Sequence, residues 1–179
     1  MNLRLIKRNR LYEGRVFNVI VDDVEYPSGK KSIREVAEHH GGAVALAMFP
    51  DRRIVLVNQH RYPFDAFLWE LPAGKLNPGE DPLHCAGREL EEETGYRASR
   101  WEKLASIYTS PGFCSEVLHI YLARDLSEPG ERRLEEGEAT MTMRIFTIDE
   151  VIAMIERGEI KDAKTICGTL LAERRARKE

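Results

Sequence analysis

The sequence predicts an α+β protein: a mixed β-sheet sandwiched between helices, an α/β/α arrangement, preceded by an N-terminal strand arm. Three observations support this fold class. Segments rich in β-branched and aromatic residues, separated by turn signals, fill most of the first two thirds of the 179-residue chain. One short acidic helix interrupts them near the middle, and two further helical patterns close the chain. No repeat or linker divides the sequence, which favours one structural unit.

The first predicted element is an N-terminal arm, residues 1–40. Within it, "GRVFNVIVDDVEY" and "KSIREVAEHH" flank the turn signal "PSGK", and this pattern predicts a β-hairpin. The opening segment that precedes the hairpin carries a helical signal. We therefore expect a helix followed by two long strands.

The remaining elements belong to a predicted main domain, residues 41–179. "GAVALAMF" and "RIVLVNQHR" flank the turn "PDR" and are expected to pair with each other as buried strands. Later strands are expected in "WEKLASIYT", "EVLHIYLARDL" and "TMTMRIFTI". The segment "TIDEVIAMIERG" starts with a capping box at Thr147 and Glu150, and "DAKTICGTLLAERRARK" forms a final helix.

Composition narrows the class of protein. Charged residues make up 32% of the chain and the net charge is −3, which is typical of a soluble globular protein and not of a nucleic-acid binder. The apolar runs are too short to span a membrane, and no export signal follows the basic opening. Three scattered cysteines, Cys85, Cys114 and Cys167, predict reduced thiols in a cytoplasmic protein. The basic end "ERRARK" is interpreted as a solvated helix face, with nucleic-acid contact as the alternative.

The acidic helix has a clear start and a predicted core face. Asp81 can cap the free amides, and the proline that follows it suits the first helical position. At about 100° per residue, four residues fall in one narrow stripe that we expect to face the core. They are Leu83, Ala86, Gly87 and Leu90. Gly87 would then let another element approach closely.

The opposite side of this helix concentrates negative charge. Glu89, Glu92 and Glu93 fall together there, with Arg88 at the margin, while Glu91 is expected to point to solvent. Like charges on one helix face cost roughly a few tenths of a kcal/mol per pair. A divalent cation would reverse this effect, because Mg²⁺ takes carboxylate and carbonyl oxygens and keeps waters for a phosphate substrate. A solvated acidic face is the alternative.

The spacing of the surrounding residues favours the metal site. Gly74, five residues, Glu80, seven residues, then "RELEEETGY" from Arg88 to Tyr96 is a complete Nudix box, residues 74–96. Its seven fixed identities, each near 7% in ordinary proteins, would coincide by chance at roughly one position in 10⁸. The chain therefore resembles the Nudix hydrolases, which cleave nucleoside diphosphates linked to another group with Mg²⁺ or Mn²⁺.

The resemblance implies roles for the box residues. Glu89 and Glu93 would bind the metal directly, Glu92 directly or through water, and the carbonyl of Ala73 would complete the site. Arg88, together with Glu80, would hold the glutamates by charge-assisted hydrogen bonds. Gly74 and Gly95 would make the turns on either side of the helix.

The reaction also needs a group that takes a proton from the attacking water. In relatives this group comes from a mobile loop after the box, and "RRLEEGEAT" supplies Glu135, Glu136 and Glu138 there. The match favours Glu136 as general base and Glu138 as an additional metal ligand. Glu135 and Glu138 in the loop and Glu92 and Glu93 in the box are alternative bases, and an exposed acidic turn is the alternative for the loop.

The resemblance is closest to the ADP-ribose pyrophosphatases, through "NQHRYPF", "WELPAGKL" and "SPGFCSE". Pro111 lies sixteen residues after Gly95, where the ADP-ribose hydrolases of the family carry proline. The implied reaction hydrolyses the diphosphate of ADP-ribose to AMP and ribose 5-phosphate. The open alternatives are ADP-glucose, GDP-mannose or NADH as substrates, a non-catalytic ADP-ribose sensor, and RNA decapping or removal of oxidised nucleoside triphosphates.

The same resemblance implies substrate contacts and a partner. Arg34 and Arg61 would contact the diphosphate, or else form surface ion pairs, and Phe17 would stack on adenine or else belong to the core. The other expected substrate contacts are Glu70, Glu116 and Ser110. Cys114 replaces a common hydroxyl residue. The relatives are homodimers whose N-terminal strands cross to the partner, so a homodimer is expected here.

Overall fold

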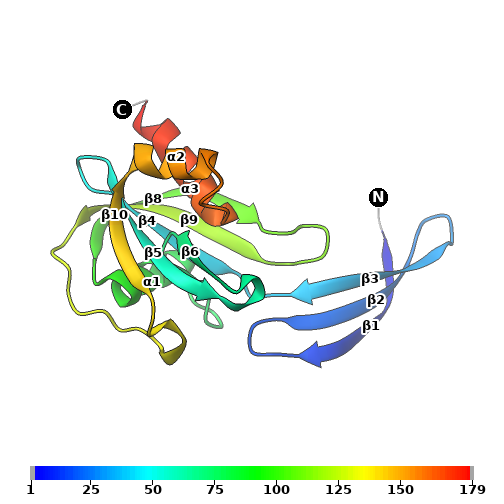
Figure 1. Ribbon diagram of the computed structural model, residues 1–179. Coiled ribbons are helices and arrows are strands. Elements are labelled where there is room, and N and C mark those ends of the chain that lie inside the picture. Colours follow the sequence, from blue (N-terminus) through cyan, green and yellow to red (C-terminus); the bar gives the residue numbers. More distant parts are fainter. Residues whose placement is uncertain (1–2, 178–179) are drawn as a thin grey trace. The chain divides into compact units, whose positions relative to one another are not determined.

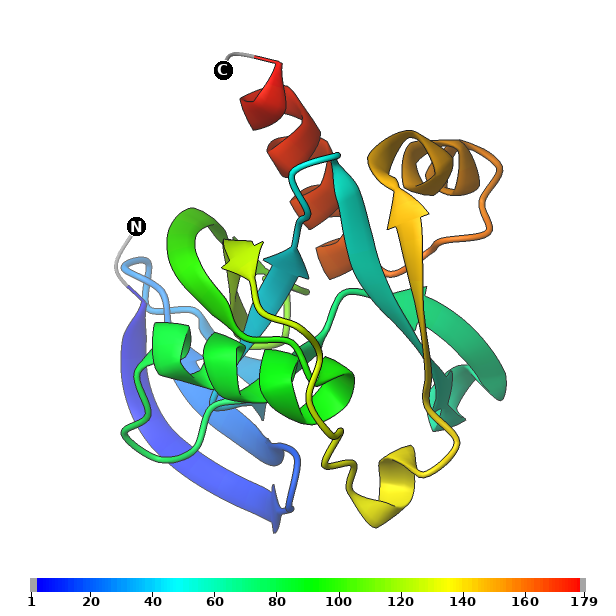
Figure 2. The same ribbon diagram turned by 90° about the vertical axis from the view of Figure 1, so that its left-hand side faces the viewer.

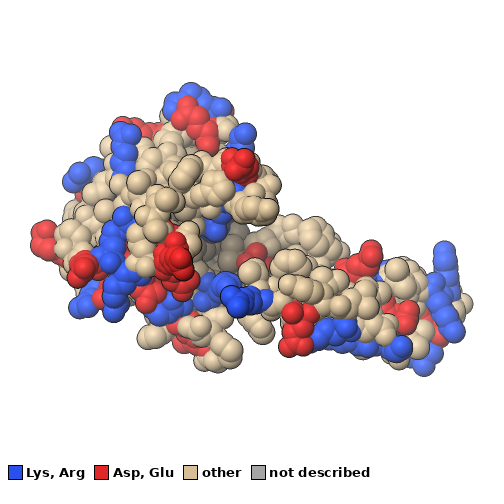
Figure 3. Space-filling model, turned by 60° about the horizontal axis from the view of Figure 1, so that its bottom comes forward, with Lys and Arg blue, Asp and Glu red and all other residues tan. Residues whose placement is uncertain are grey.

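The computed structural model describes residues 3–177. It divides into two compact units, one formed by Met1–Gly41 and Tyr108–Val117, the other by Gly42–Ile107 and Leu118–Glu179. The strands form three sheets, one in the first unit and two in the second (Figure 1). On the face shown in Figure 3, acidic and basic side chains are interspersed. Among the described residues no helix is long and apolar enough to cross a membrane.

The first unit contains a three-stranded antiparallel sheet in the order β1-β2-β3. Its strands are β1 (Arg4–Glu13), β2 (Asn18–Glu25) and β3 (Lys31–Glu38), so the predicted hairpin is confirmed. The predicted opening helix is wrong, because that segment is β1 and pairs with β2 along its whole length. Leu, Arg and Lys are good helix formers, but intrinsic propensity is a weak preference, and pairing with a neighbouring strand outweighs it.

The second unit contains two sheets. A four-stranded sheet has the order β7-β4-β9-β8, in which β4 and β9 are parallel and β4 and β7 antiparallel. A three-stranded antiparallel sheet has the order β10-β5-β6. The strands are β4 (Gly42–Ala47), β5 (Arg53–Arg61), β6 (Ala66–Glu70), β7 (Ala73–Lys75), β8 (Ala98–Tyr108), β9 (Val117–Leu126) and β10 (Thr142–Thr147). Short 3₁₀ helices are η1 (Tyr62–Phe64) and η2 (Glu136–Glu138).

The predicted pairing of the strands in "GAVALAMF" and "RIVLVNQHR" is wrong. These strands are β4 and β5, which lie in different sheets and share one isolated bridge between Met48 and Ile54. A short turn between two apolar runs usually indicates a hairpin. Here β4 pairs with β7 and β9, while β5 pairs with β6 and β10, so the turn joins strands of two different sheets.

Strand β4 shows why helices cover both faces of its sheet. Its larger side chains, Val44 and Leu46, belong to one core with residues of α2 (Ile148–Glu156) and α3 (Ala163–Ala176). Its alanines face the opposite way and belong to a second core with residues of α1 (Pro82–Thr94). The predicted α+β sandwich is confirmed, and Figures 1 and 2 show α1 on one side of the sheet and α2 and α3 on the other.

The predicted helix starts are also confirmed. The side chain of Asp81 accepts hydrogen bonds from the first turn of α1. Thr147 and Glu150 form the capping box of α2. Asp162 caps α3 by accepting from the Thr165 amide at 2.9 Å. These side chains satisfy backbone donors that have no partner within the helix.

Helix α3 offers a matched test of buried hydroxyl groups. Thr165 and Thr169 are both fully buried, but only Thr165 is hydrogen-bonded, to Asp162 and to the Leu71 amide. Among the described residues Thr169 Oγ1 has no hydrogen-bond partner. We expect T165V to lower the free energy of unfolding by about 1–3 kcal/mol. T169V should keep it or raise it by about 1 kcal/mol. Urea unfolding of both variants checks this, and equal losses would contradict it.

Candidate active site

Helix α1 presents one buried face and one charged face. Cys85, Ala86 and Leu90 are fully buried against the sheet, as expected for the core stripe of an amphipathic helix. Two residues of the predicted stripe differ from expectation. Leu83 lies in the first turn of α1 and is 39% exposed. At Gly87 an added Cβ would only reach Trp101 at 3.8 Å, so no close approach requires this glycine.

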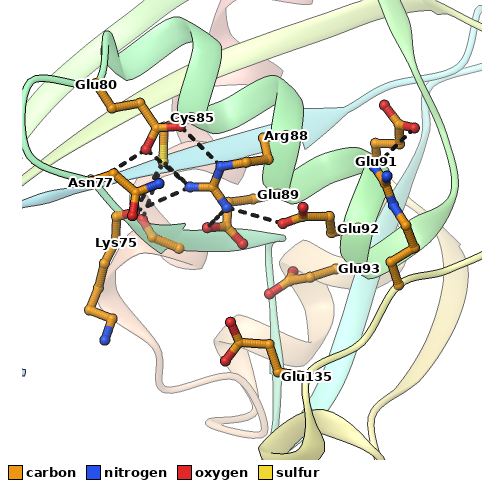
Figure 4. Close-up of polar contacts among 12 residues, drawn as sticks. Lys75, Asn77, Glu80, Cys85, Arg88, Glu89, Glu91, Glu92, Glu93 and Glu135 are labelled. Carbon is orange, nitrogen blue, oxygen red and sulfur yellow. Dashed lines mark hydrogen bonds and ion pairs between the residues drawn. The ribbon is translucent and has the colours of Figure 1, made fainter. Parts of the chain in front are cut away.

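Arg88 is the centre of the charged face. Its Nε lies 3.0 Å from Glu80, and its Nη1 lies 2.7 Å from Glu89 and 3.0 Å from Glu92 (Figure 4). The hydrogen bonds from Arg88 lower the pKa of Glu80 to about 2, and the same bond with Glu80 raises the pKa of Arg88. One guanidinium therefore holds three carboxylates.

Gly74 has a different structural role from the one expected. It lies within β7, and its φ is not positive. A Cβ added at Gly74 would lie only 1.8 Å from Glu89 Oε1, so the glycine makes room for that carboxylate. Gly95 does match the expectation, since it ends α1 with a φ of 77°.

Glu93 is the most deeply buried acid of the box, with 2% of its surface exposed. The amide of Ala73 donates to its Oε2 at 3.2 Å, so Ala73 contacts Glu93 through its N–H, while metal binding by its carbonyl stays a prediction. Burial, then the charges of Glu89 and Glu138, raise the pKa of Glu93 well above the usual range. Burial likewise raises the pKa of Glu89, despite its contact with Arg88.

The acid loop, residues 127–141, approaches the box glutamates. The charge of Glu138 raises the pKa of both Glu89 and Glu93, although burial has the larger effect on each. Glu136 is exposed, and Glu135 appears in Figure 4 on the same side of α1 as Glu93. The structure thus brings acids of this loop and of the box together, and the division of their roles stays a prediction.

A buried chain of charges extends from α3 to Arg61. Arg61 Nε donates to Glu70 Oε1 at 2.7 Å, and Lys164 contacts Glu70 Oε2. Lys164 also lies 3.0 Å from Asp162. Burial opposes ionisation of Glu70, but the hydrogen bonds from Arg61 and the Lys164 charge outweigh it and lower its pKa. Because Glu70 is 1% exposed, this position favours an indirect role in substrate binding through Arg61.

Sequence reasoning missed Lys164. Its ammonium charge also lowers the pKa of Glu93, opposing the effect of burial. The only local sign that Lys164 is buried and paired is its position, two residues after the capping Asp162 and on the buried side of the helix. Lysine is almost never buried without a partner, but the sequence does not show that the partner is Glu70, 94 residues away.

The other expected substrate residues lie in the first unit. Arg34 donates to Tyr26 Oη at 2.6 Å and lies over the same ring. Phe17 is 44% exposed, so the alternative that it belongs to a core is wrong. Glu116 lies 3.4 Å from His39. The carbonyl of Ser110 accepts from the amides of the loop that follows it.

The donor chemistry of the box fits a hard divalent cation. Within residues 3–177, no three His, Cys, Asp or Glu side chains form a ready-made metal cluster, since Arg88 draws Glu89 and Glu92 to itself. Glu89 and Glu93 are nevertheless carboxylates that burial destabilises in their charged form, and Glu93 accepts a hydrogen bond from the Ala73 amide. Such oxygens are the ligands that Mg²⁺ and Mn²⁺ prefer.

Comparisons with known proteins agree with the box. The NUDIX domain matches residues 38–167 of this chain. The chain belongs to the Nudix family. Nudix hydrolases generally use divalent metals, and this chain is a Nudix hydrolase.

Relatives extend the similarity over most of the Nudix chain. The ADP-ribose pyrophosphatase of Bacillus subtilis (strain 168) is 42% identical over 163 residues, covering 90% of this chain and 88% of that protein. The methanol dehydrogenase activator of Bacillus methanolicus is also 42% identical over 163 residues, covering 91% and 88%. The crystal structure of an ADP compounds hydrolase has a TM-score of 0.86 and 19% identity, covering 99% and 96%, which shows the shared fold.

Glu93→Gln is expected to stabilise the metal-free Nudix protein. Burial raises the folded-state pKa of Glu93, so wild-type stability is full below the unfolded-state pKa and falls as pH rises through the folded-state pKa. Glutamine does not titrate. The Tm of E93Q in EDTA should therefore exceed that of wild type by a few degrees, more so toward alkaline pH. Added Mg²⁺ should raise the Tm of wild type more than that of E93Q.

The matched control for that experiment is Glu91→Gln. The hydrogen bond from Arg97 lowers the pKa of Glu91, which is the opposite direction. E91Q should therefore not gain stability in EDTA. Calorimetry across the pH range checks both variants, and an equal gain in E91Q would show that burial of Glu93 is not the cause.

Lys164→Met should strongly destabilise the protein, because it leaves the Glu70 carboxylate buried with one cation fewer. Removing one partner of a buried ion pair costs about 3–5 kcal/mol. Urea unfolding measures the change. The control is Lys161→Met, which removes an exposed lysine just before α3. A loss in K164M no larger than that in K161M would show that the Glu70 pair contributes nothing to stability.

Proposed function

We propose that this Nudix hydrolase cleaves the diphosphate of ADP-ribose, releasing AMP and ribose 5-phosphate. The observation that carries the activity is the charged face of α1, where one arginine orders two box glutamates beside the buried Glu93. The choice of substrate is supported by the similarity to an ADP-ribose pyrophosphatase and by Pro111 in "TSPGF". Another nucleotide sugar or a dinucleotide is the second candidate, because the box recognises the diphosphate and not the group beyond it.

The proposed cofactor is Mg²⁺, with Mn²⁺ as a substitute, held by Glu89, Glu93, Glu92 and the Ala73 carbonyl. Glu138 is a further ligand. When bound, this ion would neutralise phosphate oxygens and lower the pKa of a bound water. Arg88 contributes by keeping Glu89 and Glu92 in place, and the low pKa of Glu80 ensures that the arginine stays paired.

The proposed general base is Glu136, which takes a proton from the water that attacks phosphorus. The bond from phosphorus to the bridging oxygen then breaks, and that oxygen leaves on the second product. Glu136 is exposed. It lies in the same loop as Glu138, whose charge raises the pKa of Glu89 and Glu93. Glu92 and Glu93 are the alternative bases.

Arg61 is the proposed diphosphate contact of the second unit. Its side chain is 38% exposed while its Nε and Nη2 bind Glu70. A guanidinium fixed by one carboxylate can still offer donors to phosphate oxygens. Arg34, Phe17, Ser110 and Glu116 remain proposed contacts on the strength of the family resemblance.

We also propose a homodimer formed through the N-terminal arm, residues 1–40, with residues 41–179 as the hydrolase domain. Exposed apolar side chains on the arm support this proposal. They are Leu5, Ile6, Leu11, Tyr12, Val16, Phe17 and Ile33. A fully active monomer in light scattering at micromolar concentration would refute the dimer. The three cysteines are free thiols, which fits a cytoplasmic location.

The substrate is tested by a panel of ADP-ribose, ADP-glucose, GDP-mannose and NADH, each assayed with Mg²⁺ and with EDTA. ADP-ribose should show the highest kcat/KM, with AMP as product. EDTA should abolish release of AMP. A higher kcat/KM for another member would overturn the choice of substrate, and no metal-dependent release from any of them would overturn the hydrolase itself.

Kinetic measurements should distinguish the roles of the two loop acids, Glu136 and Glu138. Glu136→Gln removes the base and should lower kcat by about 10²–10⁴-fold without changing the Mg²⁺ concentration that gives half-maximal rate. Glu138→Gln removes a ligand and should raise that Mg²⁺ concentration. The control is Glu131→Gln, an exposed acid earlier in the same loop. If E136Q retains near-normal kcat, the base is another loop acid, Glu135 or Glu138, or one of the box acids Glu92 and Glu93.

A further inference from the structure

The acid loop is fastened to the last turn of α1. The final carbonyls of a helix have no donors within the helix. Here donors from the loop supply them: the Gly130 amide bonds Gly95 O at 2.8 Å, and the Arg133 amide bonds Glu92 O at 2.9 Å. The Nε of Arg132 bonds Glu93 O at 2.6 Å. Three successive contacts thus join the loop to the part of α1 that carries Glu92 and Glu93.

Arg132 differs from the other two contacts because it also reaches the far end of the loop. Its Nη2 donates to Met141 O at 3.1 Å, just before β10. One guanidinium therefore connects the helix end, the start of the acidic segment and its exit. A planar guanidinium carries its donors on separate nitrogens, here Nε and Nη2, whereas a lysine carries all its donors on one nitrogen.

The acidic segment between these anchors is itself hydrogen-bonded. The Glu138 amide bonds Glu135 O at 2.9 Å, and the Glu135 amide bonds Glu138 Oε2 at 3.1 Å. The Met141 amide bonds Glu138 O at 2.7 Å. Met141 thus accepts from Arg132 through its carbonyl and donates to Glu138 through its amide. Fixing Met141 fixes the turn that presents Glu138.

Gly95 is a second part of this connection. A Cβ added there would lie 2.3 Å from Gly130 O, so a side chain at this position would push the loop away from the helix. The glycine of the box therefore serves the loop as well as the end of α1.

We propose that Arg132 is a positioning residue that clamps the acid loop onto α1 and so sets where Glu136 and Glu138 lie relative to Glu89 and Glu93. This inference rests on the proposed hydrolysis, since it assigns the clamp to the acids of that reaction. Arg132 touches neither substrate nor metal in this proposal, and acts through the backbone at both ends of the loop.

The test compares Arg132→Met, Arg132→Lys and the matched control Arg133→Met. Arg133 is the adjacent arginine, but its side chain pairs with Glu91 at the surface, and its amide contact survives the substitution. R132M should lower kcat by about 10- to 100-fold with KM within about threefold, because small misplacement of catalytic groups has effects of this size. R132K should recover part of the loss, and R133M should match wild type.

Two further measurements separate positioning from a general loss of structure. In the E136Q/E138Q background, R132M should lower kcat less than about twofold further, because the clamp has no acids left to place. In metal-free protein, hydrogen exchange of amides 133–141 should accelerate in R132M while the rest of the chain keeps its protection.

Unchanged exchange in R132M, an equal kcat loss in R133M, or a full multiplicative loss in the E136Q/E138Q background would each overturn the clamp. Failure of the proposed function is seen separately, as a wild-type protein that cleaves no nucleotide sugar. In that case the exchange measurement still decides whether Arg132 holds the loop.

Discussion

The charged face of α1 depends on one guanidinium. Glu89, Glu92 and Glu93 lie on one side of the helix and repel one another. Arg88 offsets this repulsion by contacting Glu89 and Glu92, and it also contacts Glu80, which precedes the helix. Arg88 is itself held by Glu80, whose ionised form this contact strongly favours. The arrangement leaves Glu93 outside the arginine's reach, buried and supported by an amide.

The fold supports this face from two sides. Below α1, small side chains of β4 let the helix lie close to the sheet, and β7 supplies Gly74 and the Ala73 amide next to the glutamates. On the other side of the sheet, larger side chains of the same strand pack under α2 and α3. Helix α3 in turn carries Lys164, whose positive charge acts to lower the pKa of Glu93.

The end of α1 is as important as its middle. A helix that stops at a glycine leaves carbonyls that need donors. In this protein the acid loop provides them, through Gly130, Arg132 and Arg133. The same contacts that complete the helix therefore bring a second group of acids to the first. This links helix capping, a structural requirement, to the arrangement of the proposed catalytic residues.

Prediction from sequence succeeded where the signal is local. The cap at Asp81, the capping box at Thr147, strands β2 to β5 and β8 to β10, and the charged face of α1 all follow from residues within a few positions of one another. It failed where pairing with a residue or strand far away in the sequence determines the structure. The opening segment became a strand because β2 is available to pair with it, and β4 and β5 separated because other strands flank each of them.

By itself the sequence determined the chemistry of the box: which acids share a helix face, which arginine lies beside them, and to which family the chain belongs. The tertiary structure alone decided that Gly74 makes room for Glu89, that Lys164 lies against Glu70 and that Arg132 joins both ends of the acid loop. The reason is the range of the forces. Helical periodicity acts over a few residues, whereas these contacts join residues 9 to 94 positions apart and exist only once the sheets and helices have packed.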